Sequence, residues 1–230
     1  MTSIPDILKT MDYGPSPESQ KEALAWLEQH QRRFGLFIND AWSVPGNTFA
    51  SFNPADGKEL AQLTQATTAD VDRAVAAARA ALVGWQALGG HGRAKVLYAL
   101  ARQLQKHARL FAVLETLDNG KTVRETRDVD LPLAARHFYH HAGWAQLLSE
   151  EFAGYRAVGV VGQIVPWNFP LLMLPGRSRR HWRRAIAWSS SRPSSPHLPH
   201  CCLPKSASAP GCPPVSSTSR LATAKWARPS

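Results

Sequence analysis

The residue with the clearest chemical potential in this sequence is Asn168, at the centre of a Pro-Trp-Asn-Phe-Pro segment that spans residues 166–170. The apolar run 157–165 lies directly before it and is typical of a buried strand. Because ligands of α/β proteins bind beyond the carboxyl ends of the strands, this order predicts that Asn168 lies at a ligand site. Its amide could donate a hydrogen bond to an oxygen that gains negative charge in a reaction. The alternative is that Asn168 only caps the following helix, and local sequence by itself favours this alternative.

Three histidines offer a second pattern, because His137, His140 and His141 have the i, i+3, i+4 spacing that can hold a metal on one helix face. Partly exposed helix histidines without a metal fit the same spacing, and this interpretation is favoured. Histidines and cysteines also gather near the end of the chain, with a spacing that matches no standard zinc pattern. These residues are His197, His200, Cys201, Cys202 and Cys212. No metal site is therefore predicted.

Two further patterns are expected to carry no chemistry. Gly159 and Gly162 lack the G-x-G-x-x-G spacing of a standard dinucleotide-binding loop. Lys121 and Arg124 follow a helix stop, and we predict that both side chains are solvated rather than catalytic.

The elements that must position Asn168 are those of an α/β domain. Helices are predicted over residues 17–33, 68–85, 92–106, 108–117 and 131–150, and strands over 36–38, 49–52 and 157–165. Thr67 and Asp70 are spaced as a capping box for the second helix. Asn119 or Gly120 can take the left-handed position that ends the fourth helix, and Pro132 is tolerable only in the first turn of the fifth. The apolar stripe of the second helix is Val71, Val75, Ala78, Leu82 and Trp85.

The charge of the chain is distributed very unevenly. The 27 lysines and arginines and 17 acidic residues give a formal net charge of +10 over 230 residues. All of the acidic residues lie in residues 1–174, together with an equal number of basic ones, so this part is neutral. Residues 175–230 hold the entire positive excess and all three cysteines. A single, evenly basic domain is therefore excluded.

Several global classes are also excluded. The longest apolar runs are far shorter than the ~20 residues that a membrane helix needs. The acidic N-terminus does not resemble a secretory signal. The part before Cys201 contains no cysteine and is therefore not a disulfide scaffold. A cytoplasmic protein is expected.

Six segments, in the right order, resemble the aldehyde dehydrogenase superfamily. They are residues 36–42, 53–57, 71–85, 115–121, 139–144 and 159–170. The resemblance covers about residues 35–174 and is most specific in the last two segments. Residues 10–19 further resemble the leader of family sixteen, whose members carry a second, dehydrogenase-like module.

This resemblance implies the N-terminal part of a Rossmann-like cofactor domain and NAD- or NADP-dependent oxidation of an aldehyde to an acid through a cysteine thioester. It implies that the Asn168 amide forms half of the oxyanion hole. It also implies that the four preceding residues line the cofactor cleft; these are Ile164, Val165, Pro166 and Trp167. The cofactor-ribose lysine, the general-base glutamate and the nucleophilic cysteine of the family all lie downstream of this motif.

The resemblance stops at Leu174, and residues 175–230 allow three interpretations: a basic nucleic-acid arm with Trp182 and Trp188 as stacking aromatics, a metal site, or a segment translated out of frame. The genetic code tests the third. Reading the third base of each codon with the first two of the next permits a long family-like continuation that includes G-N-S-V-V-L-K-P-A-E. The single-codon residues Trp182, Trp188 and Trp226 fit it in place. We therefore favour a one-base insertion or deletion near the codon of Leu174.

We accordingly expect three parts: a helical leader over residues 1–34, a partial aldehyde dehydrogenase domain over 35–174, and a disordered basic tail over 175–230. The truncated sheet predicts poor folding and exposed apolar sheet surface, because a parallel sheet must be covered on both faces. We expect no turnover of aldehyde, no specific nucleic-acid binding, no membrane association and no native oligomer, although family members oligomerise. A non-catalytic protein whose tail binds nucleic acid is the alternative.

Overall fold

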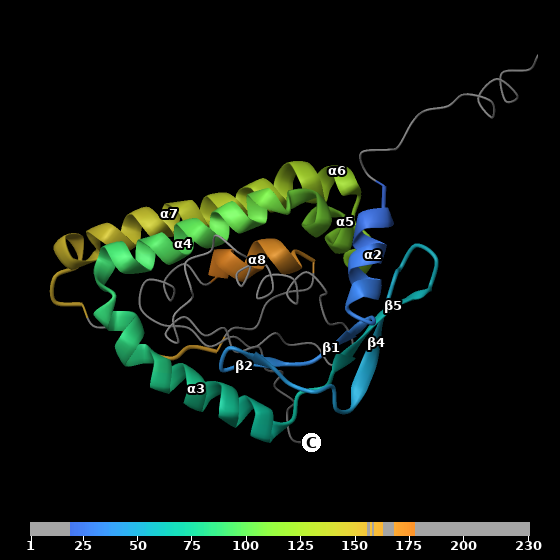
Figure 1. Ribbon diagram of the computed structural model, residues 1–230. Helices are drawn as coiled ribbons and strands as arrows, with labels where there is room; N and C mark the ends of the chain where they lie inside the picture. Colours follow the sequence, from blue (N-terminus) through green and yellow to red (C-terminus); the bar gives the residue numbers. More distant parts are fainter. Residues whose placement is uncertain (1–18, 156, 158, 163–167, 178–230) are drawn as a thin grey trace, which may run out of the picture.

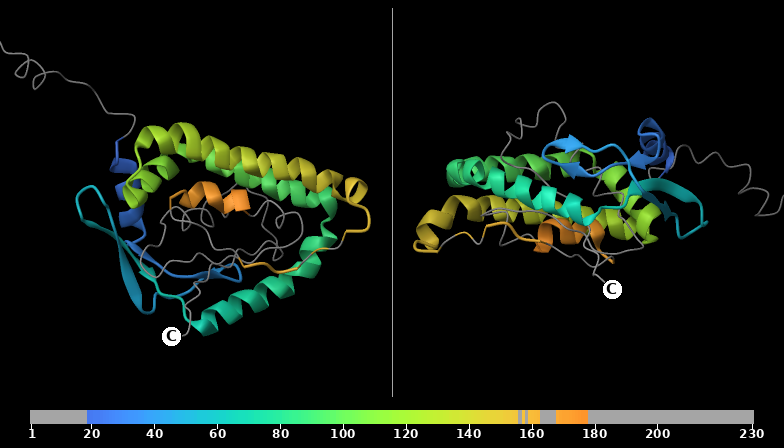
Figure 2. Two further views of the ribbon diagram at one scale, coloured as in Figure 1. Left: turned by 180° about the vertical axis from the view of Figure 1, so that it is seen from behind. Right: turned by 90° about the horizontal axis from the view of Figure 1, so that it is seen from below.

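The computed structural model describes residues 19–155, 157, 159–162 and 168–177 of the 230-residue chain. Within these residues the chain forms mixed helix and sheet, which confirms the predicted α/β class. Figure 1 shows α4 (Gly89–Lys106) and α7 (Leu131–Glu151) side by side along one edge, with α8 (Pro170–Arg177) beside them. Helix α3 (Thr68–Ala87) lies along the opposite edge. The views in Figure 2 give the same arrangement.

Two small sheets lie near the start of the described chain. Strands β1 (Arg33–Phe34), β5 (Glu59–Thr64) and β4 (Thr48–Phe52) form one sheet, in which β5 pairs with β1 in parallel and with β4 in antiparallel fashion. Strands β2 (Phe37–Ile38) and β3 (Ala41–Trp42) form a hairpin. Its two-residue loop, Asn39-Asp40, has positive φ at both positions, as a tight hairpin turn requires.

The first described helix is shorter than the sequence predicts. Helix α2 spans Lys21–Gln29 and ends before Arg33, which instead begins β1. Gln31 and Arg32 have φ angles of 54° and 50°, so the backbone leaves the helical region there. The predicted start at residue 17 lies outside the described residues.

The second predicted helix is confirmed as α3, together with its start signal. The Thr67 side chain accepts the Asp70 N–H, and the Asp70 carboxylate accepts the Thr67 N–H, which completes the capping box. Of the predicted stripe, Ala78 and Trp85 are buried, and the other three residues are only half-buried. The buried face has shifted by about one residue, because Ala74 and Ala81 are buried with them.

The next three helices agree with the sequence except in the connection between the second and the third. Helix α4 starts three residues before the predicted Gly92, and α5 (Ala108–Asn119) ends on Gly120 with a left-handed φ of 84°. A short helix α6 (Val123–Glu125) and a π-helical turn η1 (Thr126–Asp130), neither of them predicted, lead directly into α7. Pro132 lies in the first turn of α7, as expected.

The predicted strand over residues 157–165 is not formed where the structure describes it. Residues 157 and 159–162 carry no strand pairing, and Gly159 has a φ of 96°, outside the extended region. A strand satisfies its backbone groups by pairing with a neighbouring strand. All strands of the described part lie before residue 65 and pair with one another.

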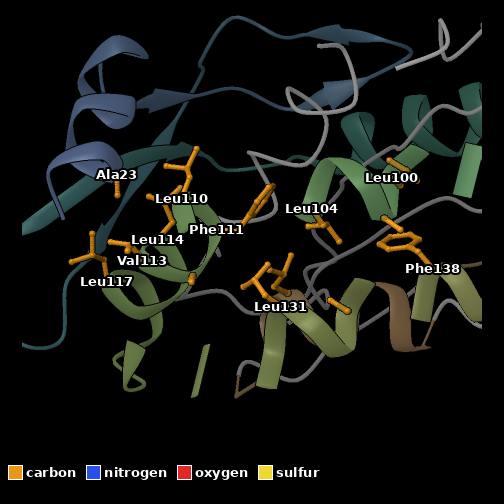
Figure 3. Close-up of a cluster of buried hydrophobic side chains, with 14 of the residues drawn as sticks. Ala23, Leu100, Leu104, Leu110, Phe111, Val113, Leu114, Leu117, Leu131 and Phe138 are labelled. Atoms are coloured by element: carbon orange, nitrogen blue, oxygen red, sulfur yellow. The ribbon is translucent and has the colours of Figure 1, made fainter. Parts of the chain in front are cut away.

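The main hydrophobic core joins the helices to the three-stranded sheet. Figure 3 shows Phe111 and Leu114 of α5 in the same cluster as Leu104 of α4 and Phe138 of α7. Leu171 of α8 is also fully buried in this cluster. Gly90 permits the close crossing of α4 and α7, because a Cβ there would lie 2.6 Å from the carbonyl oxygen of Ala145. In the described residues, no helix has the length and apolar character needed to cross a bilayer.

Candidate functional site

The candidate site is the turn that carries Asn168 into α8. Asn168 is exposed and occupies a turn position. The carbonyl of Phe169 accepts the N–H of Met173 at 2.9 Å, so Phe169 is the N-cap residue of α8 and Asn168 precedes it. Pro170 takes the first helical position, where its missing N–H costs nothing. Asn168 is therefore displaced by one residue from the helix-capping position that local sequence favours.

The first turn of α8 is tied to α5 by a buried carboxyl group. Leu171, which is fully buried, donates its backbone N–H to Glu115 Oε1 at 3.3 Å. The two residues are 56 positions apart in the sequence. Helix α8 also packs against α7. Helix α5 therefore fixes the start of α8 three residues after Asn168.

Lys121 contacts the ring of Phe169, the residue that follows Asn168. The Lys121 ammonium lies 3.7 Å from the centroid of the Phe169 ring, a cation–π contact. The same ammonium binds the Asp130 carboxylate at 2.5 Å and the Glu125 carboxylate at 3.5 Å, and its side chain is only 11% exposed. The prediction that Lys121 is solvated is therefore wrong. The tertiary packing places its side chain between η1 and the start of α8.

The prediction for Arg124 is confirmed. Its side chain belongs to α6 and is exposed to solvent. Lys121 and Arg124 are thus only three residues apart, yet the first side chain is largely buried and the second is exposed. Only the tertiary packing accounts for this difference.

Three acidic side chains lie near Lys121 and the start of α8. Glu115 and Asp130 are fully buried, and Asp118 is 8% exposed. Asp118 Oδ1 accepts the hydroxyl of Ser51 at 2.6 Å, which links α5 to β4. The hydroxyls of Thr116 and Thr126 lie 3.0 Å apart and link α5 to η1. We call Glu115, Asp118 and Asp130 with Lys121 the buried charge cluster.

The buried charge cluster shifts the pKa values of two of its acids upwards. Burial raises the pKa of Glu115 to about 8; the Leu171 N–H opposes this, while the nearby Asp118 and Asp130 add to it. Burial likewise raises the pKa of Asp130, and the Lys121 ammonium opposes the rise. In the described part of the chain, Glu115 Oε2 and Asp130 Oδ1 have no hydrogen-bond partner. At neutral pH Glu115 is therefore largely protonated and neutral.

The cofactor-binding residues that the sequence predicts, Ile164, Val165, Pro166 and Trp167, lie outside the described residues. Gly162, two residues before Ile164, is described, and a Cβ built on it would meet no atom within 4 Å. The geometry of a nicotinamide dinucleotide site at residues 164–167 is therefore not described.

The histidines of α7 differ in their surroundings. His140 is exposed and His137 half-buried, but His141 is 2% exposed, so the expectation of partial exposure is wrong for His141. Its ring makes an edge contact with His140, at a centroid distance of 5.0 Å. Among the described residues, no group of three or more metal-binding side chains has a geometry that could hold an ion.

The acids of the buried charge cluster were not predicted as functional residues from the sequence. A signal for Glu115 was available, because it lies one turn after Phe111 among the mostly apolar buried residues of α5. A charged residue at such a position is rarely fully buried without a partner. No comparable signal marks Asp130, which follows three exposed residues in the sequence.

The comparisons with known proteins agree with the resemblance. Residues 42–178 match the model of the aldehyde dehydrogenase family. A putative aldehyde dehydrogenase, DhaS, of Bacillus subtilis is 43% identical over 143 residues, which is 57% of this chain and 29% of the relative. An acetaldehyde dehydrogenase of Pseudomonas aeruginosa is 39% identical over 153 residues, or 61% of this chain and 30% of the relative.

Solved structures give the same result. The structure of an aldehyde dehydrogenase from Bacillus cereus in complex with NAD+ matches with a TM-score of 0.75 and 27% identity, covering 90% of this chain and 44% of that chain. This chain thus spans about 30% of the length of the curated relatives it matches. Because the family model covers more than half of its residues, the chain belongs to the aldehyde dehydrogenase family.

Proposed function

We propose that this chain carries the first part of the cofactor-binding domain of a cytoplasmic, NAD(P)-dependent aldehyde dehydrogenase, with Asn168 as one donor of its oxyanion hole. The observation that carries the proposal is the exposed amide of Asn168 on a turn whose following residues are bound by Glu115 of α5 and by Lys121. An amide that is exposed in this way can donate to an oxygen that becomes an anion.

In the proposed reaction a downstream cysteine thiolate attacks the aldehyde carbon, and the carbonyl oxygen becomes an alkoxide that accepts the Asn168 N–H. The residues 164–167 would line the cleft for a nicotinamide dinucleotide, which, when bound, accepts the hydride that the carbon loses. Water then cleaves the thioester, which releases the acid and regenerates the thiol.

The 230-residue chain is proposed to be inactive by itself. Cys201, Cys202 and Cys212 do not match the nucleophile motif of the family. The test is to incubate the purified protein with aldehyde and NAD+ or NADP+ and to follow formation of the reduced cofactor. Aldehyde-dependent reduction above the rate without protein would show that the proposal of inactivity is wrong.

Residues 175–230 are proposed to be an out-of-frame translation of the family's continuation. The shifted codons permit the string G-N-S-V-V-L-K-P-A-E, and misread GC-rich codons account for the arginines, prolines and serines of this part. Resequencing the gene around the codon of Leu174 decides the matter. An intact reading frame through Ser230 in an independent isolate would contradict the proposal.

The role of Asn168 is tested in a gene whose frame is restored after Leu174. If that protein oxidises aldehydes, Asn168→Ala should lower kcat by about 10²- to 10³-fold, as loss of one oxyanion-hole donor does elsewhere. Arg124→Met, at an exposed position of the same domain, is the matched control and should retain full activity. Unchanged kcat in the Asn168 variant would remove the assignment.

Nucleic-acid binding by the basic tail is the competing function. Only the positive excess of residues 175–230 favours it. Sequence-selective binding that falls steeply with salt and disappears when residues 175–230 are deleted would support it. Weak binding without any sequence preference is the result expected of any strongly basic segment.

A further inference from the structure

We propose that Glu115 and Lys121 are positioning residues that together clamp the turn bearing Asn168: Glu115 accepts the N–H of Leu171, and Lys121 holds the Phe169 ring. The catalytic meaning of the clamp rests on the proposed function of Asn168. The clamp itself concerns only which side chains fix residues 169–171, and it can be tested without any catalysis.

The Glu115 half of the clamp meets a need of α8. The first N–H groups of a helix have no partner within the helix and need one from outside. Phe169, at the N-cap position, has no side-chain oxygen with which to provide one. Glu115 Oε1 accepts the Leu171 N–H from a helix that is distant in sequence, at 3.3 Å. The carboxyl group thus replaces the missing cap.

Burial makes this hydrogen bond consequential. Glu115 and Leu171 are both fully buried, so water cannot replace the acceptor if Glu115 is lost. An unpaired N–H in an apolar interior is costly, and a carboxyl group at this place likewise costs stability unless a donor meets it. The two groups are therefore mutually dependent.

The Lys121 half acts on the residue next to Asn168. Its ammonium is anchored by Asp130, which is fully buried, and by Glu125. Anchoring by two carboxylates fixes the cation at 3.7 Å from the Phe169 ring centroid. A fixed cation over a ring orients the ring and, through it, the adjoining backbone.

The two contacts have a joint consequence that neither has alone. They hold residues 169 and 171, on either side of Pro170, whose φ is restricted by its ring. The backbone direction with which the chain leaves Asn168 is therefore specified at three successive residues. Preorganised donors depend on such support from neighbouring groups.

Hydrogen exchange followed by mass spectrometry tests the clamp on the full 230-residue chain. The variants are Glu115→Leu, Glu115→Gln, Lys121→Met and the exposed control Arg124→Met. The readout is the exchange rate of the peptide that includes residues 171–173, relative to peptides from the middle of α4 and α7. Loss of one hydrogen bond or one cation–π contact should accelerate exchange there by about tenfold and about three- to tenfold respectively.

We expect faster exchange in Glu115→Leu and Lys121→Met, and unchanged exchange in Arg124→Met. Glu115→Gln should keep the wild-type rate to within about threefold, because the amide carbonyl still accepts the N–H. That rescue separates the acceptor role from a general effect of filling the site. Exchange as fast in Glu115→Gln as in Glu115→Leu would overturn the proposal.

Two further results would also overturn it: an unprotected peptide over residues 171–173 in the wild-type protein, or an unchanged rate in Lys121→Met. If Glu115→Leu does not fold, the Gln and Lys121 variants decide the question by the same criteria. Failure of the clamp and failure of the proposed function are distinguishable. Exchange reports only on the turn, and the frame-restored Asn168→Ala enzyme reports only on catalysis.

Discussion

At the scale of single residues, Glu115 is the least expected feature of the chain. It lies on the same helix as the core residues Phe111 and Leu114, and it accepts a hydrogen bond from the first turn of α8. A carboxyl group in such a place is tolerated because it is neutral at ordinary pH and meets a backbone donor. The stability of the protein should therefore depend on its protonation.

We predict that the free energy of unfolding falls as pH rises from about 4.5 to about 8, because folded Glu115 holds its proton up to about pH 8 and the unfolded residue releases it near 4.5. The folded state binds more protons over this window, so the slope is negative, at most about 1.4 kcal/mol per pH unit. Asp130, whose pKa is also raised, contributes with the same sign. Denaturant titrations at several pH values measure the slope.

Glu115→Gln should make this slope clearly shallower, leaving the part due to Asp130. Asp128→Asn is the matched control: Asp128 is exposed, and hydrogen bonding to Arg127 lowers its pKa, so removing it cannot flatten a slope of this sign. Equal slopes in wild type and Glu115→Gln would mean that Glu115 is not the group responsible.

At the scale of elements, the end of α5 decides where the buried charge cluster lies. Gly120 takes a left-handed φ of 84° and reverses the chain towards Lys121 and α6. A Cβ at Gly120 would also lie 2.7 Å from Cγ of Pro54, in the loop between β4 and β5. The helix end thus depends on glycine both for conformation and for space.

We predict that Gly120→Ala lowers the free energy of unfolding by at least about 1–2 kcal/mol, through the positive φ and the contact with Pro54. The matched control is Gly143→Ala, in the middle of α7, where an added Cβ meets no atom within 4 Å. That change should raise stability by about 0.5–1 kcal/mol, because alanine is the better helix former. Thermal or urea unfolding of both variants is the measurement, and a stabilised Gly120→Ala protein would contradict the argument.

At the scale of the whole molecule, one main hydrophobic core joins most elements of the described residues. Its members come from α2, α4, α5, α7, α8 and the three-stranded sheet, and the last of them in sequence is Leu171. Apolar side chains nevertheless remain on the surface, including Val44, Val83 and Tyr155, which are 88%, 75% and 71% exposed. These three residues lie on α3 and in loops, so they do not bear on the expected exposure of the truncated sheet.

We predict that deleting residues 178–230 changes the free energy of unfolding of the remaining chain by less than about 1 kcal/mol, the size of an ordinary surface effect. The physical reason is that a segment read out of frame carries no apolar pattern selected to pack on this core. Chemical denaturation of the two lengths in the same buffer measures the difference. A loss of several kcal/mol would show that the tail packs specifically, and would count against the frame-shift proposal.

Local rules predicted much of the fold. The capping box of Thr67 and Asp70, the left-handed Gly120 and the first-turn Pro132 were all recognisable, because each depends on residues within one turn. The strand at 157–165 could not be judged this way, because a strand is stable only with partners elsewhere in the chain. A helix after Asn168 was expected only in the alternative that Asn168 caps it, and Phe169 occupies that capping position instead.

The sequence by itself therefore determined the family and the helices α3, α4, α5 and α7, since these follow from local pattern and from similarity along the chain. Only the tertiary structure decided that Lys121 is buried while Arg124 is exposed, and that Glu115 reaches the N–H of Leu171 across 56 residues. The reason is physical: burial, and the pKa of a carboxyl group within it, depend on what packs around a side chain, and no local pattern specifies those neighbours.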